Sequence, residues 1–253
     1  MTAYYCITFF IFGIVLGSFY NVVGFRLPRN ESLIKPASHC PNCNHLLKVY
    51  ELIPIFSYMF LGGKCLKCKQ KISLYYPIFE LASGLLFVLS YLIFGLSYQL
   101  IIALVFVSMT LIVTVSDYFY MIISDEVLII ASVLILGVIF YFQGFEIFYK
   151  SILNGVIALL IMLSIKLLGD LLFKKESMGG GDIKLMFIIG LVLGWPMALV
   201  SIFLASFIAL PISIINLWVN KNHIIPFGPF LCVAGLILIY TKIDFNLLLS
   251  VLS

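Results

Sequence analysis

The chain has 253 residues, of which 63% are hydrophobic and 10% are charged, and its formal net charge is +4. Its mean hydropathy is +1.20. Soluble domains carry about 25% charged residues, so this composition excludes an ordinary soluble domain and predicts an all-α polytopic membrane protein. We expect no nucleic-acid partner.

Apolar runs of spanning or near-spanning length recur along the chain and predict eight helices, at about 4–25, 76–97, 99–117, 127–142, 152–173, 183–194, 196–217 and 225–241. The first run lacks a basic leader, so it predicts a membrane helix that is not a cleaved secretory signal. The segment 183–217 would measure about 52 Å as one helix, which exceeds a membrane core of about 30 Å. We therefore expect two helices that meet near Gly194-Trp195-Pro196, and one long kinked helix is the alternative.

Lysine and arginine residues indicate the orientation, because they are enriched in short cytoplasmic loops. Eight of the 15 lie between residues 26 and 73, and eight crossings bring four more to the same side, namely Lys174, Lys175, Lys184 and Lys221. This places the first long loop in the cytoplasm and both termini outside. The chain then divides into a first transmembrane helix (1–25), a polar cytoplasmic insert (26–74) and a helical membrane body (75–253).

Two C-x-x-C pairs stand in the insert, 21 residues apart, and they consist of Cys40, Cys43, Cys65 and Cys68. This spacing is typical of a zinc ribbon, in which each pair offers two thiolates to one tetrahedral, closed and structural Zn²⁺ site. Two disulfides are the alternative, but the cytoplasm is reducing. A thioredoxin-like redox role would need a surrounding βαβ pattern, which the sequence lacks. We expect His39 and His45, beside the first pair, to be solvated rather than ligands.

Carboxylates in or beside membrane helices are costly, and each is a candidate for function. Asp117 follows a long uncharged run, and Asp182 opens a later helix directly after three glycines, Gly179-Gly180-Gly181. The predicted topology brings both to the cytoplasmic end of their helices. Two such carboxylates can share one proton, so that one activates water while the other polarises a peptide carbonyl. This pattern favours an aspartyl protease, in which the glycines admit an extended substrate and permit unusual backbone angles.

Structural, non-catalytic interpretations of these acids, and other functions, also remain open. Asp182 is also a suitable residue to cap a helix that follows a glycine linker. Glu80 lies about one turn into the second predicted helix, where a lone carboxylate needs a partner. A transporter that relays protons through intramembrane carboxylates is the main alternative function, but it predicts acids near the midplane. A zinc protease would need an open site such as H-E-x-x-H, which is absent from the sequence.

Several motifs occur in one order along nearly the whole chain: "GSFYNVVGFRLP" (17–28), "SHCPNCNHLLKVYELIPIFSYMFLGGKCLKCKQKIS" (38–73), "YYPIFELASG" (75–84), "SDYFYMIISD" (116–125), "GGGDIKLM" (179–186) and "IPFGPFL" (225–231). In this order they resemble those of the type IV prepilin peptidases, which are membrane aspartyl proteases with a GxGD motif. Two residues depart from the family pattern: Ser116 stands where isoleucine is usual, and Ser124 stands where proline is frequent. Neither position supplies chemistry.

The resemblance implies that Asp117 and Asp182 form the catalytic pair and that Asp125 is an accessory residue. It identifies Gly179 and Gly181 as the fixed glycines of GxGD. It also implies cleavage of the basic leader of type IV prepilins or pseudopilins at the cytoplasmic face of the bacterial inner membrane. Family members with the complete insert commonly also N-methylate the new terminus with S-adenosylmethionine. The residues that bind the methyl donor are not predicted, and Glu80, which we expect to be an accessory residue, and the insert are the candidates. We expect membrane lipid as a further partner; the oligomeric state is not predicted.

Overall fold

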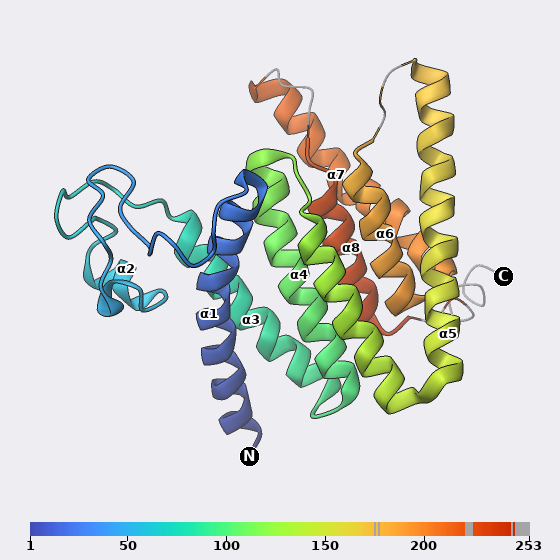
Figure 1. Ribbon diagram of the computed structural model, residues 1–253, viewed down its shortest axis with the longest axis horizontal. Helices are drawn as coiled ribbons and strands as arrows, with labels where there is room; N and C mark the ends of the chain where they lie inside the picture. Colours follow the sequence, from blue (N-terminus) through green and yellow to red (C-terminus); the bar gives the residue numbers. More distant parts are fainter. Residues whose placement is uncertain (175, 177, 221–224, 244, 246–253) are drawn as a thin grey trace. The chain divides into compact units, whose positions relative to one another are not determined.

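The computed structural model describes every residue except 175, 177, 221–224, 244 and 246–253. Its described part consists of helices and loops, and the only β-type pairing there is two isolated bridges, His39–Leu46 and Lys64–Lys71. The chain forms two compact units, Met1–Leu96 and Ser97–Ser253 (Figure 1). The all-α prediction is therefore confirmed.

Five helical segments in the described residues are long and apolar enough to cross a membrane: Thr2–Arg29, Tyr75–Phe94, Tyr98–Tyr120, Asp125–Phe173 and Trp195–Asn216. Large apolar side chains remain exposed along these helices, as expected where lipid replaces water as the solvent. The chain is thus a membrane protein, whereas the count of eight crossings stays a prediction. Lys175 and Lys221, on which the predicted orientation partly rests, lie outside the described residues.

The first unit is built on two long helices, α1 (Thr2–Arg26) and α3 (Tyr75–Phe94). They approach closely through small residues. An added Cβ at Gly13 would lie 2.7 Å from the Cα of Gly84, and one at Gly17 would lie 2.7 Å from the Cβ of Ser83. Small residues at such crossings allow the two backbones to approach closely, and the resulting van der Waals packing promotes helix association in a membrane.

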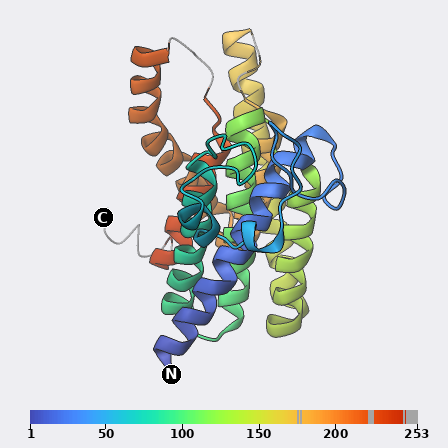
Figure 2. The same ribbon diagram turned by 90° about the vertical axis from the view of Figure 1, so that its left-hand side faces the viewer.

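Between α1 and α3 the chain forms a mostly irregular insert with three short helices: η1 (Leu27–Arg29), η2 (Val49–Glu51) and α2 (Phe56–Phe60). The insert lies beside α1 and in front of it in the turned view (Figure 2). Its loops hold the two cysteine pairs.

The second unit contains five helices: α4 (Tyr98–Tyr120), α5 (Asp125–Phe173), α6 (Gly180–Leu193), α7 (Trp195–Asn220) and α8 (Gly228–Thr241). Its buried core lies mainly on α4, α6 and α8, whose fully buried side chains include Phe106, Leu185 and Leu231. Helix α4 contacts both α5 and α8, and α6 contacts α5, α7 and α8. The amino end of α6 is thereby held beside the carboxyl end of α4, which positions the candidate site.

Helix α5 corrects the predicted boundaries. The sequence predicted two helices that end at 142 and begin at 152, with a connection between them. The structure instead has one helical segment of 49 residues that is interrupted only at Gly144 (φ 81°, ψ 178°). These angles are accessible to glycine but strained for other residues, so a single residue changes the helix direction without a loop. Glu146 and Lys150, expected in that loop, form an i,i+4 ion pair of 2.6 Å on the helix surface.

The segment 183–217 forms two helices, as predicted. Helix α6 ends at Leu193, and Gly194 (φ 79°, ψ 156°) leads directly into α7 at Trp195. Pro196 has no amide hydrogen and cannot continue the backbone hydrogen bonds of α6. Proline is well tolerated in the first turn of a helix, so α7 begins here with little loss of stability.

Candidate active site

Asp117 is positioned by the last turn of α4. The helix ends at Tyr120, and Met121 takes a left-handed conformation (φ 54°) in which its N–H donates to the carbonyl of Asp117 at 2.9 Å. The Asp117 side chain is buried, with a relative exposure of 7% for the residue. The chain reverses within four residues and begins α5 at Asp125, so the acid lies at the base of a tight connection.

Asp182 is the third residue of α6, and it is buried with a relative exposure of 8%. Gly179 caps the helix with ordinary angles (φ −69°, ψ 148°), and none of the three preceding glycines has a positive φ. The expectation that they supply unusual backbone angles is therefore wrong. Asp182 is not the N-cap residue either, because Gly179 holds that position and Asp182 lies inside the first turn of α6.

The two aspartates meet at the first residue of α8. The N–H of Gly228 donates a hydrogen bond of 3.1 Å to Asp117 Oδ2. A Cβ added at Gly228 would lie 2.8 Å from this oxygen and 3.4 Å from Asp182 Oδ1. The two carboxylate oxygens are therefore at most about 6 Å apart, the sum of these distances, which is within the range at which two carboxylates influence each other's ionisation. Residues separated by 65 positions in the sequence thus share one buried site.

The two carboxylates have unequal surroundings. Asp117 accepts the Gly228 N–H at the amino end of α8, where the helix dipole also favours a negative charge. Asp182 Oδ1 is buried and has no hydrogen-bond partner within the described protein. A buried carboxylate without donors is favoured in its protonated form, whereas one that accepts a backbone N–H is favoured as an anion. The geometry thus suits one ionised and one protonated aspartate.

Ile123, in the connection between α4 and α5, packs against two of the glycines at this site. An added Cβ would lie 2.8 Å from the Ile123 side chain at Gly181, and 2.9 Å from it at Gly228. At Gly180, by contrast, an added Cβ would meet nothing within 4 Å, and at Gly179 the nearest atom would be Asp182 Oδ2 at 3.7 Å. Close packing therefore explains Gly181 and Gly228, but not the two glycines before Gly181.

An ion pair that the sequence did not predict joins α6 to the start of α5. Lys184 Nζ is 2.7 Å from each carboxylate oxygen of Asp125, which is the first residue of α5. Both side chains are about half exposed. The pair joins the helix that carries Asp182 to the connection that follows Asp117. From the sequence, Lys184 was used only to predict the orientation of the chain in the membrane. Its position two residues after Asp182 could have indicated a role at the site.

Glu80 lies in the first unit, on α3. Its carboxylate is buried and accepts the N–H of Ile55 at 2.8 Å, and Ser18 of α1 is a second hydrogen-bonding partner. The partner that the sequence predicted this carboxylate to need is therefore a backbone N–H of the insert. Ile55 has a positive φ of 63°, which is strained for a β-branched residue and is maintained where surrounding contacts fix it.

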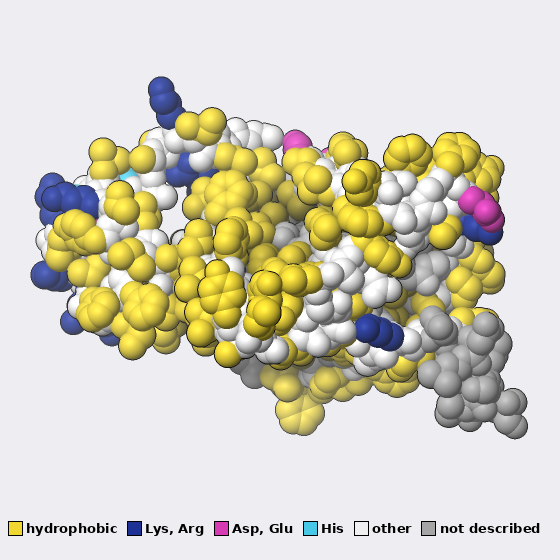
Figure 3. Space-filling model, turned by 90° about the horizontal axis from the view of Figure 1, so that it is seen from below, with side chains coloured by type: hydrophobic (Ala, Val, Ile, Leu, Met, Phe, Trp, Pro, Cys, Tyr) yellow, Lys and Arg dark blue, Asp and Glu magenta, His cyan; other side chains and the backbone are white. Residues whose placement is uncertain are grey.

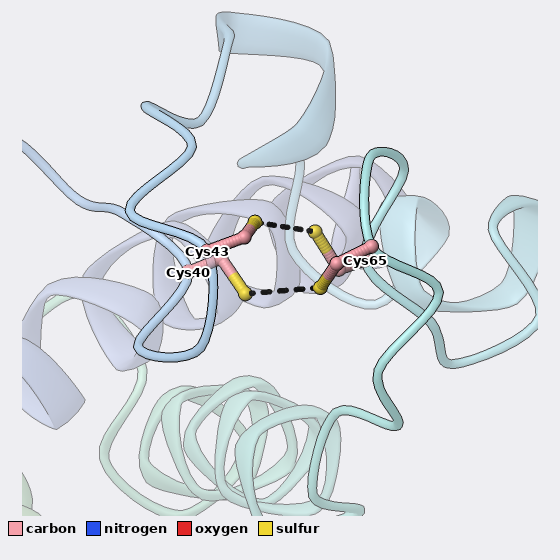
Figure 4. A group of neighbouring side chains, drawn as sticks. Cys40, Cys43 and Cys65 are labelled. Carbon is pink, nitrogen blue, oxygen red and sulfur yellow. Dashed lines mark hydrogen bonds between the residues drawn. The ribbon is translucent and has the colours of Figure 1, made fainter.

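The four cysteines of the insert form a compact cluster, in which the two pairs face each other (Figure 4). Cys40 Sγ lies 3.8 Å from Cys68 Sγ, and Cys43 Sγ lies 3.9 Å from Cys65 Sγ. All four sulfur atoms lie within 4.8 Å of one another. These separations are much longer than a disulfide bond of about 2.05 Å. They fit a tetrahedral metal site, since Zn–S bonds of about 2.3 Å place sulfur atoms roughly 3.8 Å apart.

His45 is not a member of this cluster. Its Nε2 lies 3.1 Å from Glu51 Oε2, and the same oxygen accepts the N–H of Lys48 at 2.9 Å. The Lys48 N–H is the main cause of the lowered pKa of Glu51, and His45 lowers it further against the opposing effect of burial. The expectation of a solvated His45 is therefore wrong. Glu51 was not singled out in the sequence, because its role depends on a fold that the loop adopts around it.

Comparisons with known proteins agree with these features. Residues 11–94 match the family model described as the bacterial peptidase A24 N-terminal domain, and residues 104–214 match that of the type IV leader peptidase family. No solved structure gives a significant match.

Curated relatives match over most of the chain. A Bacillus subtilis protein is 36% identical over 91% of this chain and 92% of its own length. A Neisseria gonorrhoeae protein is 32% identical over 92% of this chain and 89% of its own length, and a Pseudomonas aeruginosa protein is 31% identical over 89% and 86%. Each is named prepilin leader peptidase/N-methyltransferase. This chain therefore belongs to the type IV leader peptidase family, and it is a membrane-embedded peptidase.

Proposed function

We propose that this chain is an aspartyl endopeptidase that removes the leader peptide of type IV prepilins or pseudopilins. One observation carries the proposal: Asp117 and Asp182, from separate helices, both lie against Gly228 in a buried site. The relatives' names support the substrate class.

In the proposed reaction, Asp117 is the base and Asp182 is the acid. Asp117 takes a proton from a water molecule as its oxygen attacks the scissile carbonyl, and Asp182 gives its proton to the carbonyl oxygen. When the tetrahedral intermediate breaks down, the oxygen returns its proton to Asp182, and the leaving amine receives the proton held by Asp117. The Gly228 N–H supports this assignment, because it stabilises the ionised form of Asp117 before the reaction begins.

Asp125, Gly179 and Gly181 are proposed to be accessory to this chemistry. Asp125 binds Lys184, and Gly181 lets α6 pack against Ile123, so both help to hold Asp182 in place. Gly179 stands just before α6, where a side chain would lie close to Asp182. There its contribution is access for an extended peptide, not packing.

We propose that the chain crosses the bacterial inner membrane eight times, with both termini outside and the aspartates at the cytoplasmic face. The break at Gly144 supports a division of α5 into two crossings. The concentration of lysine and arginine in the insert supports its cytoplasmic location. Since a prepilin has a basic leader before an apolar helix, its scission point would rest at this face. The division into 1–25, 26–74 and 75–253 belongs to the same proposal.

We propose that the chain also methylates the new amino terminus of the cleaved pilin, with S-adenosylmethionine as the source of the methyl group. The N-methyltransferase names of the relatives support this activity. Glu80 is the proposed accessory residue, because it joins α3 to the insert through Ile55. The insert is further proposed to hold a structural Zn²⁺ on its four cysteines, whose closed, all-sulfur donor set leaves no position for substrate.

The test is proteolysis by the purified full-length protein in lipid vesicles, with a prepilin as substrate. Asp117→Asn and Asp182→Asn are each expected to reduce leader cleavage by at least about a thousandfold, since neither amide can exchange a proton as a carboxyl does. Glu146→Gln is the matched control, because Glu146 is exposed and pairs with Lys150 on the surface of α5. Wild-type cleavage by either asparagine variant would refute the aspartyl mechanism. Mass spectrometry of the product reports the scission site and the methyl group together.

A further inference from the structure

The short helix α2 of the insert exposes an unusual set of side chains for a cytoplasmic loop. Phe56 is 52% exposed, Met59 is 69% exposed and Phe60 is 86% exposed. In a loop surrounded by water, three large apolar side chains exposed together would destabilise the folded state. Such contiguous apolar patches mark a binding surface. The question is which partner covers them.

The depth of α2 is fixed by a hydrogen bond. Ile55, the residue before α2, donates its N–H to Glu80, which is the sixth residue of the membrane helix α3. At 1.5 Å per residue, Glu80 lies about 7 to 8 Å along the helix from its first residue, Tyr75. Interfacial helices bury their apolar face about 5–10 Å into the boundary between headgroups and acyl chains. The hydrogen bond therefore sets α2 at the depth of the bilayer interface.

The direction and charge of the surface agree with this depth. Figure 3 looks at the molecule from the side on which α1 begins, and it shows hydrophobic side chains on the face of the insert turned toward the viewer. Lysine and arginine side chains lie along the outer edge of that face. The loop that follows α2 contributes four exposed lysines, Lys64, Lys67, Lys69 and Lys71. An apolar face with a basic edge matches the acyl chains and negative headgroups of an anionic bilayer.

We propose that α2 anchors the insert in the cytoplasmic leaflet, with Phe56, Met59 and Phe60 among the acyl chains and the lysines at anionic headgroups. The anchor keeps the four-cysteine cluster at the membrane surface. It is independent of the peptidase chemistry, because it concerns only the first unit. A protein partner, such as the prepilin, is the competing occupant, and the experiment distinguishes it.

The test places one tryptophan on α2 in the full-length protein. Trp195→Phe and Trp218→Phe remove the two natural tryptophans, and Phe60→Trp supplies the probe. The protein is reconstituted in vesicles of phosphatidylethanolamine and phosphatidylglycerol that contain brominated acyl chains. Two comparison variants calibrate depth: Leu89→Trp, at an exposed apolar position within α3, and Glu31→Trp, at a charged and exposed position after α1.

We expect brominated lipid to quench the Phe60→Trp probe at least about threefold more than the Glu31→Trp probe, without added prepilin. In vesicles of neutral lipid alone, quenching of the Phe60→Trp probe is expected to fall about twofold, because the lysines lose their partners. Quenching equal to that of the Glu31→Trp probe would overturn the anchor. Shielding that occurs only after prepilin is added would assign the surface to protein, and equal quenching in neutral vesicles would overturn the choice of anionic lipid.

Discussion

The N–H of Gly228 donates to Asp117 Oδ2 at 3.1 Å, and this bond joins residues that are 111 positions apart in the chain. It makes the start of α8 part of the candidate active site, although Gly228 itself has no side chain. The contact also distinguishes the two aspartates, because no comparable donor reaches the buried Asp182 Oδ1 within the described residues.

Gly228→Ala is therefore expected to abolish most cleavage. The added methyl group would lie 2.8 Å from Asp117 Oδ2 and 2.9 Å from the side chain of Ile123, so at least one of them must move. A misplacement of about 1 Å in an aligned active site lowers kcat by about a hundredfold. The measurement is single-turnover cleavage of prepilin in vesicles. Gly137→Ala is the matched control, because an added Cβ there meets nothing within 4 Å; equal rates for the two variants would contradict the role of Gly228.

The glycines before Asp182 are expected to differ from one another. Gly181→Ala brings a Cβ to 2.8 Å from Ile123 and displaces the start of α6, so we expect kcat to fall by at least about tenfold. Gly180→Ala enters open space in the first turn of the same helix, and its cleavage rate is expected to stay within about twofold of wild type. Both variants are compared by initial cleavage rates at saturating prepilin. A larger loss at position 180 than at 181 would refute the packing explanation.

The sequence singled out the two aspartates and the four cysteines, but it did not predict the contacts that hold the aspartates. Asp117 and Asp182 stood out because a carboxylate at the end of a long apolar run needs a reason, and the cysteines because their spacing is typical of a metal site. The Gly228 contact could not be predicted, since a backbone N–H has no sequence signature. Among the helices, the loop expected at 143–151 was wrong, because one glycine conformation at Gly144 replaces it.

The ion pair between Lys184 and Asp125 is predicted to position Asp182. Both side chains are half exposed, so the pair adds little to overall stability. It does link the helix of one aspartate to the connection after the other. Lys184→Met and Asp125→Asn are each expected to lower kcat by about tenfold and to leave KM nearly unchanged. Steady-state cleavage over a range of prepilin concentrations separates the two constants.

Exchange of the two charges completes this test. The double variant Asp125→Lys/Lys184→Asp retains an attractive pair, and its kcat is expected to recover at least part of the loss seen in the single variants. Lys150→Met removes one partner of another exposed ion pair on α5 and serves as the control for loss of a surface charge. If the double variant is as slow as the product of the two single losses, the pair does not act by positioning.

Glu80→Gln is expected to separate the two proposed activities. A glutamine carbonyl still accepts the N–H of Ile55, so the junction between α3 and the insert should be retained, while the negative charge is lost. We expect leader cleavage within about threefold of wild type and at least about tenfold less methylated product. Mass spectrometry of processed pilin gives both quantities from one sample. If cleavage and methylation are both unchanged, Glu80 has no role beyond structure.

Removal of one cysteine from the cluster is expected to remove the metal. Cys40 is buried and supplies one of the four clustered sulfur atoms, and serine offers a poor ligand in a site that selects soft thiolates. Cys40→Ser should reduce bound zinc from about one ion per chain to less than about 0.2 in the purified protein. Elemental analysis measures this ratio.

Cys6→Ser provides the control, because Cys6 lies on α1 outside the cluster. Since the aspartates belong to the other unit, the variant should keep residual cleavage, and an unchanged zinc content would rule out Cys40 as a ligand.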